Sequence, residues 1–108
     1  MGIFFIYRGG RAPQHVTHAL IDKSINEIED EDEAFSDCGD LLTVETHDGL
    51  RKIGKHAFRY CKSLRRINLK SVVEIDDWAF YACENLTDLE FGDMLETIGT
   101  VCSLHALL

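Results

Sequence analysis

No hydrophobic run in the sequence is long enough to cross a membrane. The longest early run, residues 3–7, falls far short of the roughly 20 apolar residues that a spanning helix needs. It is also too short for the core of a signal peptide, and no small-residue cleavage site follows it. We therefore expect no membrane span and no secretion signal in the chain as given, and a cytoplasmic location by default. A length of 108 residues corresponds to one domain or a piece of one.

Positive charge is also scarce. The chain has 11 Lys and Arg residues against 19 Asp and Glu residues, which gives a formal net charge of −8. Because phosphate binding needs a net positive surface, this balance argues against a general nucleic-acid binder. The hydrophobic fraction of 45% is ordinary for a globular chain, so we do not expect disorder over most of its length.

Patterns typical of catalytic or metal sites are missing. No nucleophile lies at a telling distance from a base, and the single Gly9-Gly10 pair indicates a turn instead of a phosphate-binding loop. His15 and His18 have no third ligand nearby in the sequence, and no Cys pair has the spacing of a zinc site. The acidic run 29–33 lacks the glycine bend of a calcium loop and reads as a solvated bulge. We expect no enzymatic activity, no metal and no cofactor.

What the sequence does contain is one phrase written three times. It reads Ala-Phe, two residues, Cys, two residues, Leu, and its copies begin at Ala34, Ala57 and Ala79, with offsets of 23 and 22 residues. A period of this length predicts a solenoid in which each repeat packs on its neighbours. Apolar-x-apolar segments such as 67–69 predict short strands, and the apolar spacing of three within the phrase predicts helical turns. We expect an α/β solenoid with parallel strands on a concave face and short helices or 3-10 turns on a convex face.

We expect the residues that recur in each copy of the phrase to lie in the core. Cysteines recur at one repeat position, which favours buried packing over disulfides, because free Cys behaves as a small buried hydrophobe. We therefore expect a ladder of thiols at Cys38, Cys61 and Cys83. The phenylalanines of the three copies should likewise form a stacked row: Phe35, Phe58 and Phe80.

The second copy is the clearest, and it carries a family resemblance. It runs Ile-Gly-x-x-Ala-Phe-x-x-Cys-x-x-Leu-x-x-Ile-x-Leu over residues 53–69. This pattern resembles the BspA-like leucine-rich repeats, which occur in surface proteins of bacteria and protists, diatoms included. The resemblance covers roughly residues 15–100 and implies a curved repeat scaffold for protein recognition, with no catalytic residues to carry over.

The same pattern divides the chain into three parts. We expect an N-terminal lead-in or cap over residues 1–14 and a solenoid of about three to four repeats over residues 15–100. The phrase is lost in residues 101–108, which predict a degenerate or truncated last repeat. Apolar residues there would leave a solenoid end uncapped and prone to self-association: Val101, Leu104, Leu107 and Leu108.

Basic residues gather in one stretch, 51–70, which holds eight of the eleven and no acidic residue. One interpretation is a patch for anions or nucleic acid. The interpretation that we favour is neutralisation between stacked repeats, because repeat register places basic residues beside acidic ones. The expected pairs are Lys52 with Glu74, Lys55 with Asp77, Lys62 with Glu84 and Arg66 with Asp88.

The outward residues of the strands are the candidate binding positions, because a solenoid can vary them without disturbing its core. We expect a concave polar surface for an unidentified protein ligand, formed by His18, Asp22, Thr43, Glu45, His47, Arg66, Asn68, Lys70, Asp88 and Glu90. Leu20 and Gly92 share these repeat positions. Two alternatives stay open: anion or nucleic-acid binding through residues 51–70, and a truncated fragment of a larger repeat protein with no independent function.

Overall fold

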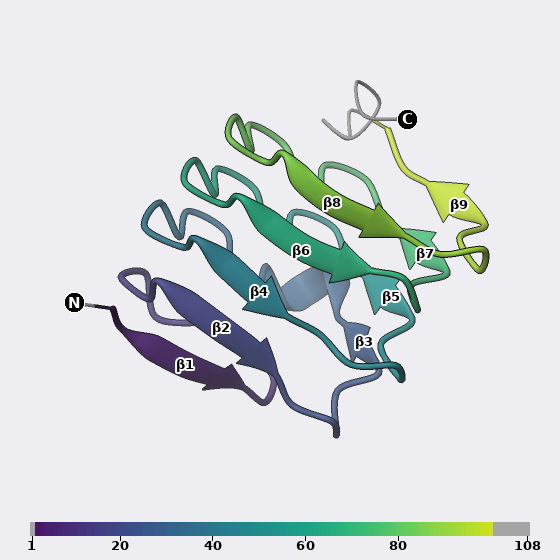
Figure 1. Cartoon of the computed structure of the whole chain (residues 1–108), viewed down its shortest axis with the longest axis horizontal. Helices are drawn as coiled ribbons and strands as arrows, with labels where there is room; N and C mark the ends of the chain where they lie inside the picture. Colours follow the sequence, from purple (N-terminus) through teal and green to yellow (C-terminus); the bar gives the residue numbers. More distant parts are fainter. Residues whose placement is uncertain (1, 101–108) are drawn as a thin grey trace.

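Two parallel β-sheets run side by side along the chain in a computed structural model that describes residues 2–100 (Figure 1). The larger sheet has the spatial order β1 (Phe4–Tyr7), β2 (His18–Ile21), β4 (Thr43–Glu45), β6 (Arg66–Leu69) and β8 (Asp88–Phe91). The smaller sheet has the order β3 (Glu27–Ile28), β5 (Lys52–Ile53), β7 (Glu74–Ile75) and β9 (Thr97–Ile98).

Each coil of the chain contributes one strand to each sheet in turn. Strands that lie side by side in a sheet therefore come from successive coils. Ala19 pairs with Val44, Val44 with Ile67 and Ile67 with Leu89, all in parallel register. The predicted parallel-strand solenoid is therefore confirmed, with about four coils. The proposed boundaries of the lead-in and of the repeats stay predictions. Residues 101–108, with the degenerate repeat expected there and its apolar Val101, Leu104, Leu107 and Leu108, lie outside the described residues.

The expected helices of the repeat phrase are not confirmed. The three turn segments, residues 34–41, 57–64 and 79–86, are chains of turns, and the one helical element among the described residues is the 3-10 turn η1 (Asp30–Asp32). At the second segment, His56 directly before it and Tyr60 within it have φ of 59° and 61°. Two left-handed residues four positions apart interrupt any right-handed helix, so an apolar spacing of three does not produce one here.

Backbone hydrogen bonds of the turn segments alternate between local and cross-coil partners. The N–H of Arg59 donates to the carbonyl of His56 at 3.2 Å, within its own turn. The N–H of Phe58 instead donates to the carbonyl of Ala79 in the next coil, at 2.8 Å. The N–H of Phe35 bonds the carbonyl of Ala57 in the same way, at 2.7 Å. The turns therefore stack through a hydrogen-bond ladder of their own, beside the ladders of the two sheets.

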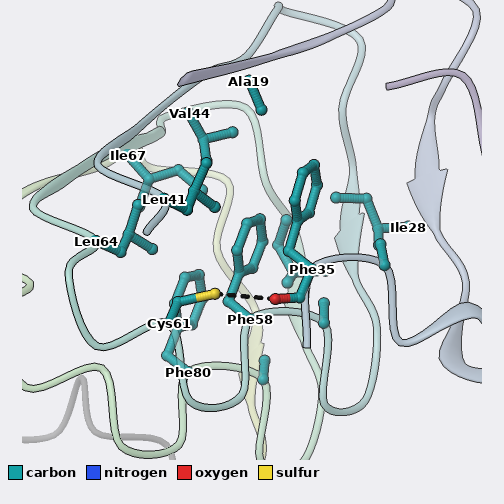
Figure 2. Close-up of a cluster of buried hydrophobic side chains, with 14 of the residues drawn as sticks. Ala19, Ile28, Phe35, Leu41, Val44, Phe58, Cys61, Leu64, Ile67 and Phe80 are labelled. Carbon is teal, nitrogen blue, oxygen red and sulfur yellow. Dashed lines mark hydrogen bonds between the residues drawn. The ribbon is translucent and has the colours of Figure 1, made fainter. Parts of the chain in front are cut away.

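A column of aromatic rings runs through the core between the sheets and the turn segments (Figure 2). The ring centroids of Phe35 and Phe58 are 5.0 Å apart, those of Phe58 and Phe80 are 5.2 Å apart, and both interplanar angles are 4°. All three side chains are fully buried, so the predicted phenylalanine row is confirmed. Tyr7 extends it, with its ring 5.1 Å from Phe35 and its hydroxyl donating to the carbonyl of Gly10 at 2.7 Å.

The thiols of the repeat phrase form a second buried column. Cys61 donates to the carbonyl of Phe35 at 3.1 Å (Figure 2), and Cys83 donates to the carbonyl of Phe58 at 3.1 Å. Both are free thiols, as is Cys38, so the packing interpretation is confirmed for these three cysteines. Each thiol adds a hydrogen bond across the coils that alanine or valine could not supply.

Phe58 lies in the middle of the aromatic column, so truncation should remove contacts with two coils at once. We expect Phe58→Ala to lower the free energy of unfolding by about 3–5 kcal/mol, measured by urea denaturation followed by circular dichroism. Phe4→Ala, which truncates a ring that is 76% exposed, should change it by less than about 0.5 kcal/mol. Equal losses in the two variants would contradict the core assignment.

Ala82 offers an unusual test of the turn geometry, because its φ of 60° is unfavourable for any residue with a Cβ. Replacing it with Gly should raise the free energy of unfolding by about 0.5–1 kcal/mol, since relief of the left-handed strain outweighs the entropy of Gly. Glu84→Gly, at an exposed position of the same turn segment without positive φ, should instead lower it by a similar amount. A loss of stability in both variants would contradict the assigned geometry.

Candidate binding surface

The outer face, which we define as the side of the larger sheet that points away from the core, carries two rows of side chains. Strand register places five residues in each row. The first row is Phe4, His18, Thr43, Arg66 and Asp88. The second row is Ile6, Leu20, Glu45, Asn68 and Glu90. Seven of the ten predicted binding residues therefore lie together on one face, because alternate residues of a strand point to the same side.

The other three predicted residues follow the strands and have local partners. His47 is half-buried in the loop after β4, where its Nε2 lies 2.9 Å from the carbonyl of Ile25 and its Nδ1 accepts the N–H of Gly49 at 3.0 Å. Asp22 accepts the N–H of Ser24 at 3.0 Å and also the hydroxyl of Ser24, and these bonds lower the pKa of Asp22. Both side chains shape loops beside the outer face.

The polar half of the outer face spans β4, β6 and β8. Arg66 forms an ion pair with Glu45 at 3.6 Å, and Lys70 forms one with Glu90 at 2.9 Å. The hydrogen bond to Glu90 raises the pKa of Lys70. A shallow hollow of about 230 Å³ opens here, and it is lined by Val44, Glu45, Thr46, Arg66, Asn68, Asp88 and Glu90. Its lining offers carboxylates, an amide and a guanidinium, which suit hydrogen bonds to a polar partner.

The other half of the outer face, over β1 and β2, is apolar. Phe4, Ile6 and Leu20 are 76%, 44% and 45% exposed. The Phe4 ring stacks on the imidazole of His18 with centroids 4.7 Å apart, and a hollow of about 400 Å³ lies beside them. Sequence reasoning assigned His18 and Leu20 to this face but missed Phe4 and Ile6, because it took residues 1–14 as a lead-in. The available signal was the uninterrupted apolar run of residues 3–7, which forms a strand with one apolar face exposed.

Four of the eight basic residues in the stretch 51–70 form ion pairs with acidic residues of neighbouring coils. Lys52 in the smaller sheet lies 3.5 Å from Asp30, 4.0 Å from Glu74 and 3.8 Å from Asp76. Partial burial opposes its charge, but the carboxylates of Asp30 and Glu74 outweigh burial and raise the pKa of Lys52. The predicted pairing of Lys52 with Glu74 is thus confirmed. Arg59 lies 3.4 Å from Glu33 in the preceding coil.

The other predicted charge pairs are not found. Within residues 2–100, no ion pair joins Lys55 to Asp77 or Lys62 to Glu84, and Arg66 pairs with Glu45 although Asp88 is its register neighbour. The backbone N–H of Lys55 instead binds Asp30 at 2.9 Å.

The interpretation of the acidic run 29–33 as a solvated bulge is wrong for Asp30, which contacts Lys55 and Lys52 of the next coil. Partial burial disfavours its charge, but the N–H of Lys55 and the ammonium of Lys52 hold the pKa of Asp30 below its ordinary value. Asp30 therefore ties the run to the next coil.

The described part of the chain has neither a cluster of metal ligands nor a helix that could cross a membrane. Residues 2–100 contain no group of three or more His, Cys, Asp and Glu side chains arranged to hold a metal ion. His15, one of the two weak candidates, has its Nδ1 3.5 Å from a carboxylate oxygen of Asp40. No helix over the same residues is long and apolar enough to cross a membrane.

The comparisons with known proteins agree with the repeat architecture. No curated protein and no solved structure shows a significant match to the chain. A family model described as the BspA type leucine-rich repeat region matches residues 14–104 in six copies. The match spans most of the chain and includes every copy of the Ala-Phe-x-x-Cys-x-x-Leu phrase. The chain therefore belongs to the BspA-type leucine-rich repeat family.

Proposed function

We propose that this chain is a protein-interaction module that contacts its partner through the outer face. Leucine-rich repeat families are typically non-catalytic and serve as interaction repeats. The observation that carries the proposal is the register of the larger sheet, which brings outward side chains from five strands into two aligned rows. These side chains can be exchanged without altering the buried column beneath them, so the face can be adapted to a particular partner.

The composition of the outer face favours a protein partner of mixed character. Its polar half supplies carboxylates, the Arg66 guanidinium and the Asn68 amide, and its apolar half supplies Phe4 and Leu20. Protein interfaces typically combine a few apolar anchors with a polar rim.

A catalytic role has less support. The thiols of the repeat phrase are the strongest nucleophiles by residue type among the described residues, and they are buried. Burial raises the pKa of Cys38 to about 11, and the neighbouring thiol of Cys83 together with burial raises the pKa of Cys61. Protonated, inaccessible thiols are poor nucleophiles.

Anion or nucleic-acid binding through residues 51–70 also has less support than protein binding. Four basic residues of this stretch already lie within 4.0 Å of a carboxylate: Lys52, Arg59, Arg66 and Lys70. An incoming phosphate would have to compete with these carboxylates. The fragment hypothesis stays an alternative.

A peptide selection tests where the chain binds without assuming a partner. Peptides would be selected from a random display library against the immobilised chain, and their affinities measured for variants. We expect Asp88→Arg, in the polar hollow, or Leu20→Arg, in the apolar half, to weaken binding by about tenfold or more.

The matched control is Glu84→Arg, which makes the same charge change as Asp88→Arg at an exposed position of a turn segment. It should alter affinity by less than about twofold. Peptides whose affinity falls with Glu84→Arg but with neither outer-face variant would contradict the proposal. Salt-sensitive binding of RNA or DNA by the intact chain, lost on reversal of Lys62 and Arg65, would favour the anion-binding alternative.

A further inference from the structure

The first strand of the larger sheet is an edge strand with none of the usual protection against pairing. Proteins protect exposed edges with charged side chains, proline or bulges. The opposite edge strand, β8, carries Asp88 and Glu90. In contrast, β1 has the sequence Phe-Phe-Ile-Tyr, and its Phe4 is the most exposed large hydrophobic side chain among the described residues. The sheet is therefore open to a further strand at β1 but not equally at β8.

The backbone of β1 has groups available for such a strand. The carbonyls of Ile3 and Tyr7 point toward β2, where they accept the N–H groups of Thr17 and Asp22 at 2.9 and 3.0 Å. Because backbone groups alternate direction along a strand, the N–H and C=O of Phe4 and Ile6 point to the other side. Within residues 2–100, no strand pairs with that side of β1.

The distribution of charge favours contact between two copies at the β1 end of the solenoid over contact at the β8 end. Residues 2–26 contain three basic residues and one acidic residue, although the whole chain has a net charge of −8. Residues 71–100, at the other end, contain eight acidic residues and no basic residue. Two copies that meet at β1 would bring few like charges together, whereas two copies that meet at β8 would repel.

We propose that β1 of one copy pairs antiparallel with β1 of a second copy and joins the two larger sheets into one. With the two-fold axis at Phe5, Phe4 lies opposite Ile6 of the second copy, and Ile6 lies opposite Phe4. Four backbone hydrogen bonds then use the outward N–H and C=O groups of both residues on both strands. The half-buried Phe5 rings would meet on the core side of the joined sheet.

The contact is short, which sets its strength. A four-residue strand with its flanking side chains buries less surface than the roughly 800 Å² per partner of a standard interface. We therefore expect a reversible dimer with a Kd of the order of micromolar. Pairing at this edge leaves the outer face open to solvent, so the dimer is compatible with the proposed interaction surface, with which it shares Phe4 and Ile6.

Sedimentation equilibrium of the full chain over a range of concentrations tests the proposal. The mass should rise from the 12.3 kDa of one chain to twice that value as the concentration passes through the micromolar range. Phe4→Lys, at the most exposed position of β1, should weaken dimerisation by about tenfold or more, because an edge lysine disfavours strand pairing. Ile6→Lys serves as a second variant, and circular dichroism checks that both are folded. The control Glu90→Lys, on β8, should leave the dimer unchanged.

Three results would overturn the proposal. The first is a chain that stays monomeric at several hundred micromolar. The second is a dimer unaffected by both β1 variants. The third is assembly that continues past the dimer and persists in both β1 variants, which would place the contact elsewhere in the chain, as an uncapped C-terminal end would. Loss of peptide binding on Asp88→Arg, in contrast, would leave the dimer untouched, because Asp88 lies on β8 at the other end of the sheet.

Discussion

Every coil of this protein depends on the next coil for its backbone hydrogen bonds. The strands satisfy one another across the two parallel sheets, and the turns do the same through bonds such as Phe58 N–H to the Ala79 carbonyl, at 2.8 Å. Parallel stacking forces equivalent residues of successive repeats to lie directly side by side. Phenylalanine therefore stacks on phenylalanine, and the thiols of Cys61 and Cys83 each donate to the phenylalanine carbonyl of the preceding coil. The repeat phrase therefore consists of residue types whose side chains pack well against the same residue type in the neighbouring coil.

The same stacking separates the residues that maintain the fold from those that are free to bind. Along each strand of the larger sheet, alternate residues point to the buried column or to the outer face. Inward positions are restricted by packing against neighbouring coils, whereas outward positions such as Asn68 and Glu90 contact mainly solvent and each other. This separation allows one scaffold to present different surfaces. In this chain it produces an apolar half over β1 and β2 and a polar half over β4 to β8.

Sequence reasoning succeeded wherever the repeat itself carried the information. The parallel solenoid, the phenylalanine row and the thiol column follow from register alone, and so does the pair of Lys52 and Glu74. It failed for the turn segments, because a left-handed φ at Tyr60 leaves no trace in a sequence where glycine would be the usual sign. Long exposed side chains such as Lys62 can choose among several positions, so register does not determine their partners. The contribution of β1 to the apolar half of the outer face was missed because β1 contains no copy of the phrase.

Native-state hydrogen exchange of the full chain most directly tests whether cross-coil bonds hold the turns in place. The amides of Phe35 and Phe58 donate to carbonyls of the next coil, although both lie in segments without strand or helix. Opening them requires the coils to separate, so their free energies of exchange should match that of Ile67 in β6 within about 1 kcal/mol. Exchange of Phe35 and Phe58 at rates close to those of an unstructured peptide, with Ile67 still protected, would contradict the account.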